Sequence, residues 1–193
     1  IVGVSTAIWL QRSGFKVTII DQKGPATGAS HGNAGILAAS SIIPVPNPSL
    51  IKKLPFFLLS KNSPVFFKMS YLPRMFPFLM SYLSKSNLRE VNKYAERMTP
   101  LIFDTVCQHS SLAKGTGAEK FISNQDYCFG YETEQKFIND KRVWELRKKH
   151  GLPFEVVTGN DFSKFDPFYK NLFDVIVKCK NHGKINDPGL YVK

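Results

Sequence analysis

The stretch IVGVSTAIWLQRSGFKVTIID, residues 1–21, decides the fold that this sequence predicts. Its first part predicts a helix that ends near Gly14, because glycine adopts the left-handed backbone of a helix C-terminus without strain. Residues 15–20 are rich in β-branched side chains and predict a buried parallel strand, which Asp21 follows directly. The helix is predicted from residues at spacings of three and four, which lie on neighbouring turns: Val4, Ala7, Ile8 and Gln11.

A helix, a strand and an acidic residue in this order are typical of a Rossmann dinucleotide-binding unit. Gly3 stands where the third glycine of the motif G-x-G-x-x-G belongs. We therefore expect the first strand and the first two glycines to precede Ile1, so that the chain is a fragment. The helix N-terminus favours a pyrophosphate, and Asp21 favours an unphosphorylated ribose. An ordinary helix–strand pair with a solvated Asp21 is the alternative.

Residues 25–40, PATGASHGNAGILAAS, form a small-residue, glycine-rich and almost uncharged segment. Such a segment cannot build a core, but it lets backbone amides approach a ligand closely. We expect it to lie along a bound nucleotide; a flexible surface loop is the alternative.

Residues 1–21 and the stretch GASHGNAGILA, residues 28–38, resemble the FAD-dependent D-amino acid dehydrogenase/oxidase superfamily, in particular the small subunit of the quinone-linked bacterial D-amino acid dehydrogenases. That family has a helix V-x-G-x-x-x-A-x-x-L, a strand V-T-V-I-D and a loop S-x-x-N-A-G. Residues 121–137, 144–167 and 186–193 resemble the family more loosely. The positions that match its motifs are Gly3, Ala7, Leu10, Val17, Asp21, Ser30, Asn33, Ala34 and Gly35.

The resemblance implies an α/β fold, in which a Rossmann-like FAD-binding unit precedes a helical excursion and part of an α+β substrate domain. It implies that the helix start holds the pyrophosphate, that Asp21 holds the adenosine ribose, and that the loop lines the flavin. Covalent attachment of the flavin through His31 is a less favoured alternative. The cofactor-binding residues expected on this basis are Ile1, Val2, Gly3, Asp21, Gln22, Lys23, Ser30, His31, Asn33, Ala34 and Gly35.

The chemistry implied by the resemblance is oxidative deamination of D-amino acids, with hydride transfer to flavin and release of a 2-oxo acid and ammonia. Alternatives are another FAD-dependent amine, glycine or sarcosine-type oxidase, an NAD-dependent Rossmann enzyme, and a non-catalytic truncated relative. No residue is a convincing acid or base, although Tyr127 and Tyr131 are candidates for approaching a substrate. We expect residues 1–193 alone to bind FAD poorly or not at all.

The full chain has a net charge of +11, and the positive charge is concentrated in one part of it. Residues 50–100 hold nine Lys or Arg and two Glu, interleaved with aromatic residues and prolines. A basic, aromatic surface suits an anionic membrane and hence transfer of electrons to a quinone. A packed insertion with solvated lysines is an equal alternative. Nucleic-acid binding is not expected, because no recognition motif accompanies the charge.

Three cysteines, at positions 107, 128 and 179, lack metal-ligand spacing and favour a reducing compartment. We expect no metal site and a cytoplasmic location, with peripheral contact to the inner membrane as an option.

The chain divides into a cofactor unit at 1–45, a helical segment at 46–115 and part of a substrate domain at 116–193. Residues 87–108 predict one amphipathic helix, which Pro100 weakens. Further elements expected are a hairpin within 121–131, a helix over 133–150 closed by Gly151, and strands at 154–157 and 174–180.

Overall fold

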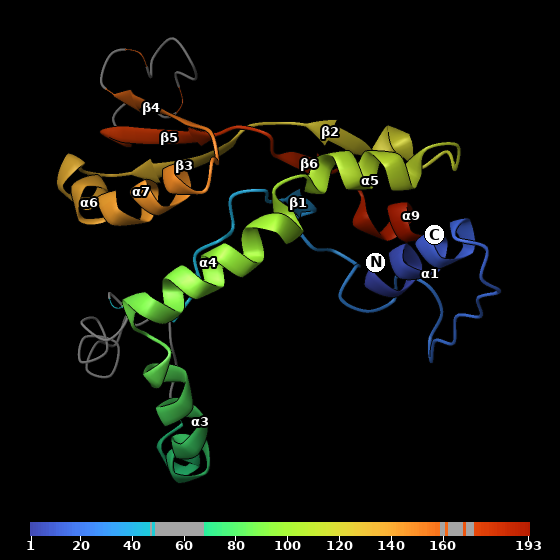
Figure 1. The fold of residues 1–193 in the computed structure, drawn as a ribbon, viewed down its shortest axis with the longest axis horizontal. Coiled ribbons are helices and arrows are strands. Elements are labelled where there is room, and N and C mark those ends of the chain that lie inside the picture. Colours follow the sequence, from blue (N-terminus) through green and yellow to red (C-terminus); the bar gives the residue numbers. More distant parts are fainter. Residues whose placement is uncertain (47, 49–67, 159–160, 162–167, 169–171) are drawn as a thin grey trace. The chain divides into compact units, whose positions relative to one another are not determined.

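The computed structural model describes residues 1–46, 48, 68–158, 161, 168 and 172–193 (Figure 1). These residues form two compact units. The first contains Ile1–Ser40 and Leu101–Lys193, and the second contains Ser41–Pro100. Helices and strands are mixed in the first unit, while the described elements of the second are helical.

A three-stranded antiparallel sheet in the first unit contains β3 (Tyr127–Tyr131), β4 (Phe154–Thr158) and β5 (Val175–Cys179). Strand β5 is central, and its Val177 lies opposite Phe129 on β3 and Val156 on β4. The strands predicted at 154–157 and 174–180 are thereby confirmed.

Helices α6 (Glu134–Asn139) and α7 (Lys141–Lys149) lie along one face of this sheet (Figure 1). Trp144 of α7 packs into a core with alternate residues of β5, because successive side chains of a strand point to opposite faces. The helix predicted over 133–150 is confirmed apart from a break at Asp140. Gly151 adopts the expected left-handed backbone, with φ of 71°. The buried members of this core are Trp144, Val175, Val177 and Cys179.

A second antiparallel sheet has the order β1 (Ile36–Leu37), β6 (Gly183–Ile185) and β2 (Ile122–Asn124). The predicted hairpin within 121–131 is wrong, because β2 pairs with β6 whereas β3 pairs with β5. A two-residue hairpin turn needs positive φ angles, and no residue between Ile122 and Tyr131 has one. The chain therefore runs on from one sheet into the other.

The helices of the first unit around this second sheet are short. They are α1 (Val2–Arg12), α5 (Thr105–Ala113), the 3-10 turn η2 (Glu119–Phe121) and α9 (Pro188–Val192). The guanidinium of Arg12 donates to the carbonyls of Ser111 and Leu112 at 2.9 and 3.0 Å, and so joins the ends of α1 and α5. Helix α1 confirms the helix predicted at the start of the sequence.

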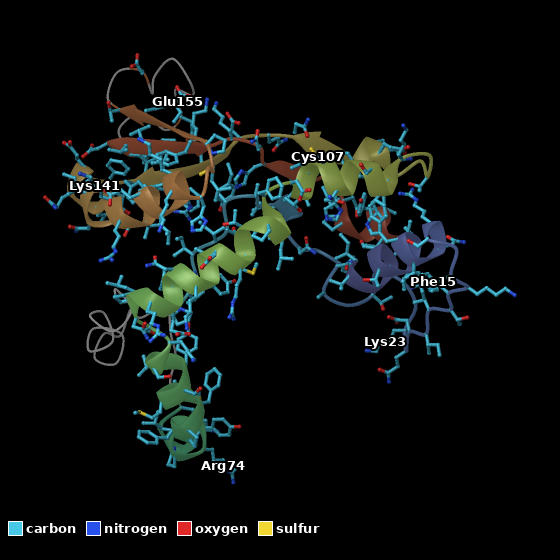
Figure 2. All side chains as sticks on the ribbon, in the orientation of Figure 1. Phe15, Lys23, Arg74, Cys107, Lys141 and Glu155 are labelled. Carbon is cyan, nitrogen blue, oxygen red and sulfur yellow. The ribbon has the colours of Figure 1, made fainter. Side chains whose placement is uncertain are left out.

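The strand predicted at 15–20 is not formed. These residues have no regular structure, and Phe15 and Ile20 are 62% and 93% exposed. Figure 2 shows Phe15 and Lys23 on the irregular segment that follows α1. A strand is stable only when a neighbouring strand takes its backbone hydrogen bonds, and none of the described residues pairs with 15–20.

The second unit contains the 3-10 turn η1 (Met69–Tyr71) and helices α3 (Leu72–Ser84) and α4 (Leu88–Ile102), α4 continuing past its boundary. The single helix predicted over 87–108 is wrong, because the chain turns at residues 103–104 between α4 and α5. Pro100 cannot donate a backbone hydrogen bond, which weakens the last turn of α4. Residues 50–67 of the basic, aromatic stretch at 50–100 lie outside the described residues.

Candidate functional site

Helix α1 has Ile1 as its N-cap, no described side chain makes a capping hydrogen bond to it, and no acidic residue lies in its first turn. A Cβ added to Gly3 would meet nothing within 4 Å. The free N–H groups and the positive end of the helix dipole at such a terminus attract an anion. This part of the structure therefore fits a phosphate group of a dinucleotide.

Ser30 lies beside this helix start. The terminal ammonium of Ile1 donates to the Ser30 hydroxyl at 2.8 Å, although the two residues are 29 positions apart in the sequence. The Ser30 side chain is buried, whereas His31, Asn33 and Ala34 after it are exposed. The structure thus brings together two of the predicted cofactor segments, the helix start and the loop.

Asn33 and Gly35 fix the shape of the loop. The amide N–H of Gly35 donates to Asn33 Oδ1 at 2.8 Å, and Asn33 Nδ2 donates to the carbonyl of Ala29 at 3.0 Å. Gly35 has a φ of 66°, and a Cβ there would lie 2.0 Å from the carbonyl oxygen of Ile185. The amide of Ile185 in turn donates to the Gly35 carbonyl at 2.7 Å. Only glycine fits at this crossing of two backbones.

Asp21, Gln22 and Lys23 form an exposed turn. The amide N–H of Lys23 donates to Asp21 Oδ1 at 2.9 Å, so the carboxylate is held within its own turn. Among the described residues, no hydrogen bond joins this turn to Gly3 or Ser30. Asp21, the predicted ribose-binding residue, is therefore not hydrogen-bonded to the helix start or to Ser30 in this structure, and neither are Gln22 and Lys23.

A cavity of about 250 Å³ begins at the start of α1 and runs between α5 and α9. Its wall includes Ile1, Val4, Ser5 and Ile8 from one side of α1, and Leu190 to Lys193 from the end of the chain. The cavity therefore lies beside the start of α1, where Ile1, Val4 and Ser5 line it.

Ser40 is the centre of a buried polar cluster that the sequence did not predict. Its carbonyl accepts from Arg147 Nε at 3.1 Å, and its amide donates to His182 Nε2 at 3.3 Å. All three side chains are less than a tenth exposed. Burial lowers the pKa of His182 and also that of Arg147. The residues come from three distant parts of the chain, so no local pattern announces them.

Tyr127 and Tyr131, which were candidates for the substrate side, belong to the packing of the sheet. The Tyr131 hydroxyl accepts from Trp144 Nε1 at 2.9 Å and donates to Asp140 Oδ2 at 3.2 Å. Burial raises the pKa of Tyr131 to about 12. The Tyr127 ring stacks on His182 with centroids 5.8 Å apart. In the described part of the chain, no three His, Cys, Asp or Glu side chains gather as metal ligands.

Residues 1–193 match the family DAO, described as FAD dependent oxidoreductase, over their whole length. The chain belongs to this family, whose cofactor is FAD.

The chain is also similar to several curated bacterial proteins. It is 33% identical to a D-amino-acid oxidase of Bradyrhizobium diazoefficiens, over 99% of this chain and 46% of that protein. It is 27% identical to D-amino acid dehydrogenase 1 of Mesorhizobium japonicum, over 81% of this chain and 38% of that protein. The chain thus spans less than half the length of these relatives. No solved structure matches it significantly.

Proposed function

We propose that the full-length protein oxidises D-amino acids to 2-oxo acids with FAD as its cofactor. The observation that carries this proposal is the match of residues 1–193 to the family of FAD-dependent oxidoreductases. The loop also lies beside the helix start, where Ser30 accepts a 2.8 Å hydrogen bond from the terminal ammonium of Ile1. A dinucleotide cofactor needs both a phosphate-binding helix terminus and a backbone that approaches closely, and these segments supply them. The similarity to a D-amino-acid oxidase over 99% of the chain supports the substrate class.

Within this proposal each predicted residue has a role. The open amides of Val2 and Gly3 bind the pyrophosphate at the positive end of α1. The turn from Asp21 to Lys23 binds the adenosine ribose, which requires it to move from its exposed position toward the helix start. The loop from Ser30 to Gly35 lies along the flavin, with exposed His31, Asn33 and Ala34 toward the cofactor.

FAD, when bound, supplies the electron chemistry by accepting a hydride from the amino acid. The described residues supply binding and orientation. Asn33 and Gly35 keep the loop backbone in one shape, and no described side chain is assigned as an acid or base.

The test is anaerobic reduction of the purified full-length protein by amino acids, followed in its visible spectrum. We expect bound flavin that D-amino acids bleach and their L-enantiomers do not. Bound flavin that only glycine, sarcosine or another amine bleaches would contradict the substrate class and favour that kind of oxidase. A protein without flavin would contradict the proposal and leave an NAD-dependent enzyme or a non-catalytic relative.

A quinone is the electron acceptor in this proposal, and α3 is the observation that favours it. Helix α3 has no buried residue, and its Phe76, Phe78 and Met80 are more than half exposed. Arg74 lies on the same helix (Figure 2) and Lys85 follows it. Exposed aromatic and basic side chains on one helix are typical of a surface that lies on an anionic membrane. No helix among the described residues is long and apolar enough to cross a membrane.

The acceptor is tested by re-oxidising the reduced flavin with oxygen or with a soluble quinone, and membrane contact by co-sedimentation with anionic vesicles. We expect faster re-oxidation by quinone, and vesicle binding that Phe76→Ser with Phe78→Ser removes. Faster re-oxidation by oxygen would contradict the quinone proposal.

A further inference from the structure

Two side chains, those of Arg147 and His182, hold Ser40 in place inside the first unit. Arg147 Nε, on α7, donates to its carbonyl oxygen at 3.1 Å. His182 Nε2 lies 3.3 Å from its amide nitrogen and 3.0 Å from its hydroxyl. The backbone and the side chain of one residue are therefore both fixed by buried partners.

The surroundings of His182 determine which ring nitrogen carries the proton. Nδ1 lies 2.8 Å from the carbonyl oxygen of Lys180, which only accepts hydrogen bonds, so Nδ1 carries the hydrogen. Nε2 is then the acceptor for the amide of Ser40. The hydrogen bond from the Ser40 amide requires an unprotonated Nε2, whereas the Ser40 hydroxyl can either donate to this nitrogen or accept from it.

Ser40 ends the segment that starts at Gly35. Between them, β1 pairs with β6, with Ile36 opposite Lys184 and Leu37 opposite Gly183. His182 comes directly before β6, and the amide of Ile185 binds the Gly35 carbonyl at 2.7 Å. One stretch of backbone thus holds the loop at Gly35 and, through His182, at Ser40.

We propose that His182 and Arg147 are positioning residues for the flavin, acting through Ser40 and β1 on the loop from Ser30 to Gly35. The inference rests on the proposed function, in which this loop lies along the cofactor. Its further content is that two residues more than 100 positions after Ser40 in the sequence set how tightly FAD is held.

The buried guanidinium of Arg147 makes contacts that an apolar core residue could not make. Its guanidinium lies over the rings of Trp144 and Phe129, at 4.4 and 5.2 Å from their centroids. Burying a guanidinium costs free energy that an apolar side chain of the same size would not. Beyond what such a side chain would supply, the charged group adds its hydrogen bond to the Ser40 carbonyl and its cation–π contacts with these two rings.

The experiment measures FAD dissociation constants and flavin absorption spectra of full-length variants at pH 7.5. His182→Phe keeps a ring to stack on Tyr127 but removes the acceptor, and Arg147→Met keeps apolar bulk but removes the donor. We expect each to raise the FAD dissociation constant about tenfold, as loss of a buried hydrogen bond does. We also expect a shift of the flavin bands. His182→Gln, whose amide oxygen restores a neutral acceptor, should remain within about threefold of the parent.

Phe154→Leu is the matched control, because it thins the same core beside Trp144 without touching Ser40. It should lower the melting temperature while leaving the flavin spectrum unchanged.

Acid gives an independent readout. Protonation of His182 removes the acceptor for the Ser40 amide. FAD binding in the parent should therefore weaken more than in His182→Gln as the pH falls below 6.5 toward the lowered pKa of His182. The titratable or charged groups around His182 are Asp104 and Cys107 of the α5 start, Asp126 before β3, Tyr127 of β3, Arg147 of α7, and Cys179 and Lys180 of its own segment. These groups are present in both proteins, so the difference between them reports His182.

The outcomes are distinct. Tight FAD binding and an unchanged spectrum in His182→Phe would overturn the inference while leaving the proposed function intact. Weakening that only follows the melting temperature, as in Phe154→Leu, would also overturn it, and so would equal weakening in His182→Gln and His182→Phe. A parent protein without flavin would overturn the proposed function and this inference together.

Discussion

Two short runs of the chain, residues 15–20 and β5, are similar in sequence, but only β5 forms a strand. Both are rich in β-branched side chains. Val177 at the centre of β5 is fully buried, whereas Ile20 is 93% exposed. The difference is the presence of neighbours, since β5 pairs with β3 and β4 on its two edges. Strand propensity therefore becomes structure only where partner strands and a covering helix are available.

The largest expected effect tests this contrast directly. Val177→Asp would place a carboxylate against Trp144 in the core, and we expect it to lower the free energy of unfolding by about 4 kcal/mol or more. Val17→Asp, in the exposed run, should change it by less than about 0.5 kcal/mol. Urea unfolding followed by circular dichroism measures both. Similar losses would show that residues 15–20 are buried in solution.

The second prediction compares alanine substitutions at two glycines of the loop, Gly35 and Gly32. Gly35→Ala should lower the free energy of unfolding by about 2–4 kcal/mol, because it combines a left-handed backbone with a clash against the Ile185 carbonyl. Gly32→Ala is the control, since Gly32 has a φ of 70° but open space around it. It should cost only about 1 kcal/mol. Equal melting temperatures of the two variants would show that the loop is not held against β6.

The third prediction concerns pH and the cluster that links the loop to the sheet. Burial lowers the folded pKa of His182, so its contribution to stability is complete above the unfolded pKa, about 6.5, and is lost as the pH falls toward the lowered value. Below pH 6.5 the free energy of unfolding should fall by up to about 1.4 kcal/mol per pH unit.

Burial also lowers the pKa of His109, which would add to the same pH dependence, so the measurement is made in a His109→Gln background. Adding His182→Gln should then flatten the profile between pH 5 and pH 6.5. An unchanged slope would contradict the neutral, buried ring.

The smallest effect is expected at the solvent-facing end of the β3-β5-β4 sheet. Asp126 Oδ2 lies 2.8 Å from Lys180 Nζ and 3.6 Å from Lys178 Nζ, and the hydrogen bond from Lys180 is the main cause that lowers the pKa of Asp126. Asp126→Asn should cost about 0.5 kcal/mol at pH 7, because these groups are partly solvated.

The stability cost of Asp126→Asn should disappear as the pH falls through the lowered pKa of Asp126, because the carboxyl group is then protonated in both the folded and the unfolded protein. Thermal unfolding at pH 7 and pH 3 measures it. A loss as large as that of Val177→Asp would show that surface charge, rather than burial, holds this region together.

Local patterns of the sequence determined the elements that depend on near neighbours. Helix α1, the α6–α7 region with Gly151 after it, and strands β4 and β5 follow from spacing, β-branched runs and the backbone freedom of glycine. The family resemblance likewise came from residues 1–38, and the whole-length family match agrees with it.

Only the tertiary structure decided what lies between distant residues. It paired β2 with β6 instead of β3, left residues 15–20 without a strand partner, and placed Ser30 at the start of α1. It also brought Arg147 and His182 to Ser40, from which each is more than 100 residues away in the sequence. Hydrogen bonds across such separations depend on how the whole chain packs, and no local pattern of side chains encodes them.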